Sequence, residues 1–262
     1  MSETGRIYNK TSDELNIIKE GADILGRVHG HVSRIIAPGL TTLELDMFAE
    51  GFIKEQGAVP SFKGYRGFPG SLCISVNDVV VHGIPGQLVL KEGDIVSVDC
   101  GVYFKGFHSD SAFTYPVGNI PENVKKLLKV TYNSLFEGIK SCRKGNRVGD
   151  ISSSIQQFVE KEGYTIVREL VGHGVGKHLH EKPEVPNFGK RGQGPSLTEG
   201  IVLAIEPMVN MGQRAVRQDR DGWTIRTRDT KPSAHYEHTV AIVNGQPEVL
   251  TTFEYIDQKM KF

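Results

Sequence analysis

The sequence predicts an α+β fold with pseudo-two-fold symmetry, an antiparallel sheet with helices packed on its outer face. Two observations predict it. The order of two helices followed by strands occurs twice along the chain, and residues 90–99 align with 197–206 without a gap, each stretch ending in a carboxylate. Half-units of this size usually bury their apolar faces against each other. We therefore expect one domain over residues 1–262, made of halves at about 12–115 and 120–250.

Helical periodicity marks the start of each half. Apolar residues recur every three or four positions over 15–36, after a Thr11-x-x-Glu14 capping box, and a second apolar face over 45–53 ends at Gly57. The second half repeats the pattern over 124–139 and 151–159, ending at Gly163. The spacing from Gly39 to Gly57 equals that from Gly145 to Gly163. The pattern predicts two helices in each half.

A hairpin with arms 94–104 and 107–115 follows in the first half, because Lys105-Gly106 suits a two-residue turn. That turn places Asp110 opposite Gly101 and diagonal to Asp99, so both carboxylates share one face within reach of one ion. Hairpin carboxylates are commonly solvated. Here Asp99 follows the apolar run 95–98, and two buried like charges require a cation.

The second half supplies two more carboxylates. The duplication places Glu206 across the pseudo-symmetry axis from Asp99, and Glu237 lies on the partner strand, 236–243. Residues 212–233 separate these arms and form an excursion long enough to wall a pocket with Trp223. Either glutamate alone is compatible with a solvated strand end, but four converging carboxylates indicate a metal centre.

Histidines complete the expected site. His173, His178 and His180 stand among glycines, which allow close approach to a crowded centre. The stretch lacks the Gly-Lys-Ser/Thr ending of a phosphate-binding loop. His82 follows the apolar stretch 79–81 and precedes a turn, a position typical of cleft residues.

The predicted donor set determines which metals fit. An oxygen-rich set with one imidazole suits manganese, iron(II) or cobalt, and zinc is not excluded. We expect two ions that share bridging carboxylates and hold a hydroxide between them.

Composition excludes several function classes. Lys plus Arg and Asp plus Glu both total 31, so no global field favours DNA or an acidic membrane. The three cysteines, Cys73, Cys100 and Cys142, lack metal-finger spacing and fit a reducing compartment. With no export-signal core in residues 1–12 and no apolar run of membrane-spanning length, we expect a cytoplasmic protein.

The chain resembles the type I methionine aminopeptidases over essentially its whole length. The strings that carry the resemblance are 75–85 (SVNDVVVHGIP), 172–176 (GHGVG), 204–210 (AIEPMVN), 221–223 (DGW) and 236–239 (YEHT). The resemblance implies the pita-bread fold. It also implies removal of the initiator methionine from nascent proteins and peptides, by attack of a metal-bridging hydroxide on the first peptide bond.

The resemblance also implies residue roles. Asp99 would chelate one ion, Asp110 and Glu237 would bridge both, and His173 and Glu206 would complete the other. Glu206 would take a proton from the bridging water, His180 would polarise the scissile carbonyl, and His82 would contact the substrate amide. A methionine-sized pocket would be walled by Tyr65, Phe68, Cys73, Leu179 and Trp223, and a monovalent site for Na⁺ or K⁺ would involve Asn77, Val79 and Ser233.

The chain departs from many relatives at three pocket positions, Arg66, Phe68 and Leu179, and Met1 to Thr11 contains no cysteine of the kind found in zinc-binding extensions. These departures bear on pocket shape and second-residue preference. They leave the expected metal ligands intact.

Two other functions compete with this interpretation. An Xaa-Pro aminopeptidase or dipeptidase would share the ligands but carries a large amino-terminal domain, whereas the first repeat here begins within a dozen residues of Met1. A non-catalytic binding module would typically have lost metal ligands.

The expected partners are a peptide amino terminus and, transiently, the ribosome, with the chain itself a monomer. The excursion is rich in basic residues that could touch ribosomal RNA, although a solvated loop explains them as well. They are Arg214, Arg217, Arg220, Arg226, Arg228 and Lys231.

Overall fold

The computed structural model describes residues 7–261, and its regular elements follow the predicted order. The helices are α1 (Ser12–Ile35), α2 (Thr42–Glu55), α3 (Glu122–Ser141) and α4 (Val148–Lys161), with short 3-10 turns at Tyr65–Gly67 and Gln258–Met260. The first-half strands are β1 (Val59–Pro60), β2 (Leu72–Val76), β3 (Val79–Val81), β4 (Ile95–Phe104) and β5 (Phe107–Pro116). The later strands are β6 (Thr165–Ile166), β7 (Val171–Gly174), β8 (Glu181–Pro186), β9 (Val202–Ile205), β10 (Met208–Asn210), β11 (Val216–Gln218), β12 (Ile225–Thr227), β13 (Ser233–His235), β14 (Glu237–Val243) and β15 (Gln246–Val249).

Side-chain caps define where the first two helices begin. The Thr11 side chain accepts from the backbone N–H of Glu14, whose carboxylate accepts from the Thr11 backbone, so the predicted capping box is confirmed. Thr41 and Glu44 form the same box at α2. Both caps satisfy backbone N–H groups that a helix end leaves without partners.

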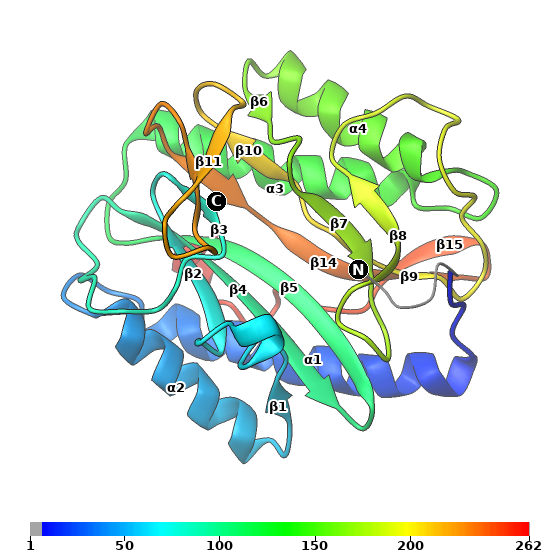
Figure 1. Ribbon diagram of the computed structural model, residues 1–262, viewed down its shortest axis with the longest axis horizontal. Helices are drawn as coiled ribbons and strands as arrows, with labels where there is room; N and C mark the ends of the chain where they lie inside the picture. The colour runs from blue at the N-terminus through cyan, green and yellow to red at the C-terminus, as the bar shows by residue number, and fades with distance from the viewer. Residues whose placement is uncertain (1–6, 262) are drawn as a thin grey trace.

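A nine-stranded sheet forms the centre of the molecule, with the order β1-β4-β5-β14-β9-β7-β8, and with β2 paired to β4 and β15 to β14. All of its pairs are antiparallel, including β5 with β14, where the two halves of the chain join. In Figure 1, α1 and α2 lie beside the half of the sheet that contains β4 and β5, and α3 and α4 lie beside the half that contains β7 and β8. The predicted α+β order of helices and antiparallel strands is therefore observed.

The aligned stretches have the same backbone structure up to the start of the strand, and the two halves differ after it. Strand β4 begins at Ile95, and β9 begins at Val202, which corresponds to Ile95 in the alignment. The turns before the strands also match, because Gly93 N–H donates to the Val117 carbonyl and Gly200 N–H donates to that of Ile242. Strand β4 is ten residues long whereas β9 is four residues long and ends directly before Glu206, so the duplication preserves the beginning of the strand better than its end.

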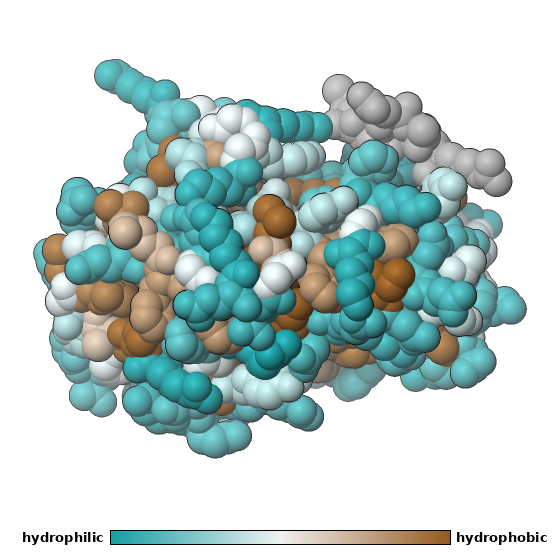
Figure 2. Space-filling model, turned by 90° about the horizontal axis from the view of Figure 1, so that it is seen from below, coloured by the Kyte–Doolittle hydropathy of each residue, from teal (hydrophilic) through white to brown (hydrophobic). Residues whose placement is uncertain are grey.

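Apolar side chains between helices and sheet form the main core. Leu25 of α1, Leu128 of α3 and Phe113 of β5 are almost fully buried in it. The side seen in Figure 2 is mostly hydrophilic, with hydrophobic residues in separate groups. Within the described residues, no helix is long and apolar enough to cross a membrane.

We predict that Leu25→Ala lowers the free energy of unfolding by about 2–5 kcal/mol, because it removes a fully buried side chain from close packing. Leu88, with 55% exposure, is the matched control, and Leu88→Ala should change stability by less than about 0.5 kcal/mol. Urea denaturation of both variants with bound metal checks this. Equal losses would contradict the assignment of Leu25 to the core.

Candidate metal centre and active site

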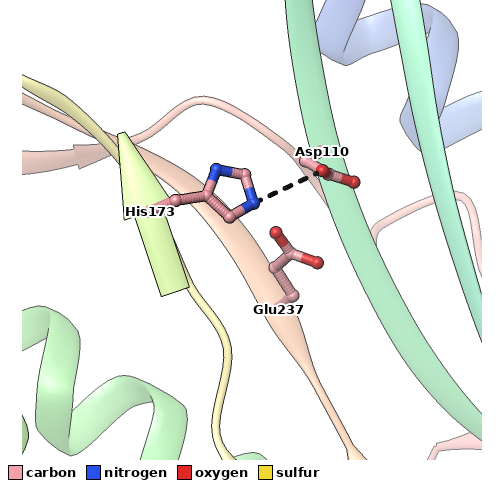
Figure 3. A group of neighbouring side chains, drawn as sticks. All are labelled: Asp110, His173 and Glu237. Carbon is pink, nitrogen blue, oxygen red and sulfur yellow. Dashed lines mark ion pairs between the residues drawn. The ribbon is translucent and has the colours of Figure 1, made fainter. Parts of the chain in front are cut away.

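Five neighbouring strands each bring one expected ligand to the same region of the sheet. Asp99 is on β4, Asp110 on β5, Glu237 at the start of β14, Glu206 directly after β9, and His173 on β7. The hairpin register pairs Gly101 with Asp110, as predicted from the Lys105-Gly106 turn. The ligand atoms of Asp110, His173 and Glu237 lie within 4.8 Å of one another (Figure 3).

The backbone around these carboxylates is held by hydroxyl groups. The Thr239 hydroxyl accepts from the Asp110 N–H at 3.0 Å and donates to the Asp110 carbonyl at 2.8 Å. Ser111 donates to the Glu237 carbonyl at 3.1 Å. The register of β5 against β14 ends at Ser111 and His238, so the Thr239 side chain continues the connection where the strands diverge.

Two glycines allow His173 to reach the centre. A Cβ at Gly172 would lie 2.4 Å from the Ala204 carbonyl oxygen, and one at Gly174 would lie 2.5 Å from that of Lys182. The His173 Nδ1 lies 2.8 Å from the Gly174 carbonyl, which assigns the proton to Nδ1 and directs the Nε2 lone pair inward. The Nε2 atom lies 3.6 Å from Glu206 Oε1 and 3.9 Å from Asp110 Oδ2.

The carboxylates are in surroundings that disfavour their charge. Burial raises the pKa of Asp99 and of Glu206 to about 7. Burial, together with the charges of neighbouring carboxylates, raises the pKa of Asp110 and Glu237 well above the usual range. Buried oxygens of Asp99 (Oδ1) and Glu237 (Oε1) have no hydrogen-bond partner. A divalent cation would remove both penalties, so these residues fit a metal.

One cavity of about 200 Å³ opens onto this centre. It is lined by all five expected ligands, by His82 and His180, and by Tyr65, Phe68, Cys73, Leu179 and Trp223, the five expected wall residues. The same five wall residues belong to one apolar cluster. Residues so far apart in sequence therefore line one pocket.

The two expected substrate-contacting histidines both line this cavity. His82 follows β3 with a positive φ of 58° and has its ring edge-on to Trp223. His180 is exposed at the mouth, with Nδ1 2.9 Å from the Tyr65 hydroxyl and its ring centroid 4.2 Å from that of His173. The pKa of His180 is lowered mainly by the surrounding protein atoms and secondarily by the charge of nearby His173. Burial lowers the pKa of His82 to about 4. Both rings are therefore neutral near pH 7.

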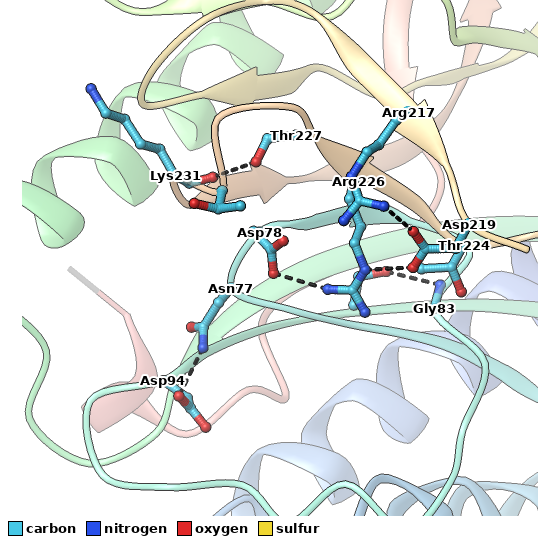
Figure 4. Close-up of polar contacts among 12 residues, drawn as sticks. Asn77, Asp78, Gly83, Asp94, Arg217, Asp219, Thr224, Arg226, Thr227 and Lys231 are labelled. Atoms are coloured by element: carbon cyan, nitrogen blue, oxygen red, sulfur yellow. Dashed lines mark hydrogen bonds and ion pairs between the residues drawn. The ribbon is translucent and has the colours of Figure 1, made fainter.

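The excursion between β9 and β14 presents Trp223. Asp221 accepts from the backbone N–H groups of Trp223 and Thr224. Figure 4 shows Arg226 between Asp219 and Asp78, with contacts of 2.6 and 3.0 Å that join the excursion to the turn before β3. Trp223 and His82 are thus carried by connected parts of the fold.

The residues expected at a monovalent site lie outside this cavity. The Ser233 N–H donates to the Asn77 carbonyl at 2.9 Å, and Asn77 begins the turn that leads to Val79. The Asn77 side chain contacts the Ile95 backbone and Asp94. The monovalent site stays a prediction.

The sequence interpretation missed His235. Its side chain is 1% exposed, both ring nitrogens lack a hydrogen-bond partner, and Nε2 lies 3.6 Å from Glu206 Oε2. Strand alternation contained the signal, because residues 235 and 237 of an extended chain point to the same side.

Comparisons with known proteins identify the family of the chain. The family model of metallopeptidase family M24 matches residues 16–244. A methionine aminopeptidase of Clostridium perfringens is 54% identical over 94% of this chain and 98% of its own length, and methionine aminopeptidase 1 of Bacillus subtilis is 53% identical over 94% and 99%.

Solved structures share the fold of this chain. The crystal structure of methionine aminopeptidase from Thermotoga maritima has a TM-score of 0.93 at 42% identity, covering 94% of this chain and 100% of that chain. The prolidase of Pyrococcus horikoshii has a TM-score of 0.78 at 22% identity, and this chain covers 64% of it, so that likeness concerns the fold alone. The predicted pita-bread fold is confirmed.

We predict that Asp99→Asn stabilises the metal-free protein relative to the parent, increasingly as the pH rises from about 5 to 8. A carboxyl whose folded-state pKa is raised favours folding while protonated, and this advantage is lost as the pH rises from its unfolded value of 3.8 toward about 7. The difference in unfolding free energy between the two proteins should change by about 2–4 kcal/mol. The charge of Asp99 also raises the pKa of His235, so the measured change includes the response of that neighbour.

Urea denaturation in a chelator measures this difference at each pH. With saturating Mn²⁺ the sign should reverse at pH 8, because the variant lacks a ligand for the ion. A stability difference that is independent of both pH and metal would show that the Asp99 carboxylate is not held among like charges.

Proposed function

The chain belongs to the methionine aminopeptidases of metallopeptidase family M24, and from this membership we propose that it removes the amino-terminal initiator methionine from nascent proteins and peptides. The observation that carries the proposal is the single cavity in which the five candidate ligands, two neutral histidines and a narrow apolar wall meet. A metallopeptidase of this family uses divalent metal.

We propose that two divalent ions occupy the centre. Asp99 would chelate one, Asp110 and Glu237 would bridge both, and His173 and Glu206 would hold the other. The mixture of carboxylates with one imidazole suits Fe²⁺, Mn²⁺, Co²⁺ or Zn²⁺. When bound, such ions generate a hydroxide at neutral pH and polarise the scissile carbonyl.

The protein side chains would position the substrate and move its protons. Glu206 is proposed to take the proton from the attacking water, a role suited to a carboxylate that lines the cavity beside the proposed ions. His180, with Nδ1 at the Tyr65 hydroxyl, would present Nε2 to the scissile carbonyl. His82, whose ring lies edge-on to Trp223, would contact the amide around the leaving nitrogen.

The apolar wall would select methionine by shape. Phe68, Cys73 and Leu179 are buried, and Tyr65 and Trp223 complete the slot. Each misfit methylene in such a pocket costs about 1–3 kcal/mol, so other first residues would be disfavoured rather than excluded. Arg66, Phe68 and Leu179 would adjust the preference for the second residue.

We further propose a cytoplasmic, monomeric enzyme whose residues 1–262 form one catalytic domain of two halves. One Na⁺ or K⁺ would bind near Asn77, Val79 and Ser233.

A transient ribosome contact would use the excursion, residues 212–233. Arg226 is paired with Asp219 and Asp78, and Arg217 with Asp219, so this contact would depend on Arg214, Arg220, Arg228 and Lys231. Sedimentation with ribosomes should weaken with added salt, and salt-independent binding would argue against it.

Metal analysis and peptide cleavage on one preparation test the proposed function. We predict that the metal-supplied protein releases methionine from Met-Ala-Ser and leaves Ala-Pro peptides intact. The Ala-Pro arm separates this activity from the Xaa-Pro enzymes that share the fold. A preparation that holds no ion after metal supply and leaves Met-Ala-Ser intact would refute the proposal.

We predict that His82→Ala and His180→Ala each lower kcat by about 10²-fold or more while both ions stay bound, because each removes a group that contacts the reacting amide. His178→Ala is the matched control for His180, since it lies on the same segment with an exposed side chain. Steady-state kinetics with metal quantification measure the effect. Full activity in either variant would end that role assignment.

A further inference from the structure

A buried ion pair lies beside the active site without contacting the proposed metal ligands. Lys10 Nζ is 2.6 Å from Glu181 Oε2, and their side chains are only 3% and 9% exposed. Among the described residues, no other lysine or arginine ion pair has both side chains less than a tenth exposed. The partners are 171 positions apart in sequence, so the pair joins two distant segments.

Such a pair is poorly explained by stability alone. Burial lowers the pKa of Lys10, and the Glu181 charge and hydrogen bond, together with the charge of Glu14, oppose that effect. Removing both charges from water is so costly that well-packed apolar residues often serve stability as well or better. A buried pair does, however, impose a definite geometry on the segments that it joins.

On one side, the pair is anchored to the body of the protein. The Lys10 backbone N–H donates to the Gly200 carbonyl at 2.7 Å, and Ile7 forms a bridge with Lys182. Helix α1 begins two residues after Lys10. Lys10 is therefore held by its own backbone and by the helix that follows.

On the other side, the pair closes the turn that carries His180. The second Glu181 oxygen accepts from the His178 backbone N–H at 3.1 Å, and Gly176 N–H donates to the His178 carbonyl. A Cβ at Gly176 would lie 2.4 Å from Lys10 Cε and 2.8 Å from Glu181 Oε1, so a side chain there would displace the ion pair. Glu181 thus ties down both ends of the short segment 178–181.

Directly before Glu181 stand Leu179, on the pocket wall, and His180, at the pocket mouth. Residues 176–180 form a bend rather than a strand, so the direction of His180 depends on how the ends of this bend are held. Glu181, the next residue, is held against Lys10, and His180 lies with Nδ1 2.9 Å from the Tyr65 hydroxyl at the cavity.

We propose that Lys10 and Glu181 are positioning residues that hold the 178–181 segment so that His180 meets the substrate carbonyl. The inference rests on the proposed role of His180. A displacement of about 1 Å at a reacting group can lower the rate about 10²-fold, so loss of the pair should mimic much of the loss of His180.

The experiment uses the full chain with bound metal. Glu181→Gln should lower kcat for Met-Ala-Ser at least about tenfold, with a smaller change in KM and the same number of bound ions. Glu184→Gln is the matched control, because Glu184 lies on the same strand and pairs with Lys182 in an exposed ion pair, with side chains 39% and 62% exposed. It should leave kcat unchanged within about twofold.

A double-mutant cycle separates positioning from a general loss of structure. In a His180→Ala background, Glu181→Gln should lower kcat by less than about twofold further, because the group that it positions is already gone. An equal fold loss in both backgrounds would overturn the proposal. So would a parent-like kcat in Glu181→Gln.

Two further measurements keep the test decisive. If Glu181→Gln folds poorly, Lys10→Met combined with Glu181→Met removes both charges together, and this double variant should fold yet show the same kcat loss; parent-like kcat would overturn the proposal. If His180→Ala alone keeps full activity, the proposed role of His180 fails, and with it the catalytic purpose of the pair.

Hydrogen exchange tests separately whether the Lys10–Glu181 pair holds the segment 178–181. Glu181→Gln should speed exchange of the His178 amide, and Glu184→Gln should not. Unchanged exchange in Glu181→Gln would refute the proposal that Glu181 holds the segment 178–181, whatever the role of His180.

Discussion

The structure depends on a concentration of negative charge that the protein alone cannot stabilise. Four carboxyl groups face one another beneath a narrow cavity, and buried oxygens on Asp99 and Glu237 lack any protein partner. Protonation or a cation must compensate them. The raised pKa values of Asp99 and Asp110 favour protonation in the absence of metal. The inward lone pair of His173 favours binding of a cation. Folding and metal binding are therefore coupled at this centre.

The carboxylates can gather in one place because the two halves of the chain join in the middle of the sheet, where one strand from each half pairs with the other. Strands β5 and β14 pair only over a short stretch, and there Thr239 and Ser111 bond to the backbone of Asp110 and of Glu237. Each ligand then comes from a different strand, so no local segment bears the whole electrostatic cost. The helices on the outer face provide the apolar burial that opposes the repulsion between the carboxylates.

Much of the fold and the candidate site could be predicted because the signals were local. The Lys105-Gly106 turn determined the register of Asp110, and the Thr11 capping box marked the start of α1. The resemblance to a known family supplied the roles. What could not be predicted depends on contacts between distant segments. The shortening of β9, the pairing of Arg226 with Asp78 and the burial of Lys10 against Glu181 follow from tertiary packing, which no sequence period records. His235 was overlooked although its alternation with Glu237 was visible.

The link from Arg226 to Asp78 bears on how substrate preference can change over evolution. It connects the segment bearing Trp223 to the turn that precedes β3, and β3 ends next to His82. Strand β12, which follows Trp223, also pairs with β3, so a substitution that moves the tryptophan shifts the histidine through this backbone pairing and through the Arg226 contacts. Size selection and the alignment of the cleaved bond are mechanically joined in this chain. New specificities should arise more readily at Leu179, which comes from the segment 178–181, than at the tryptophan or at Phe68, whose ring packs against it.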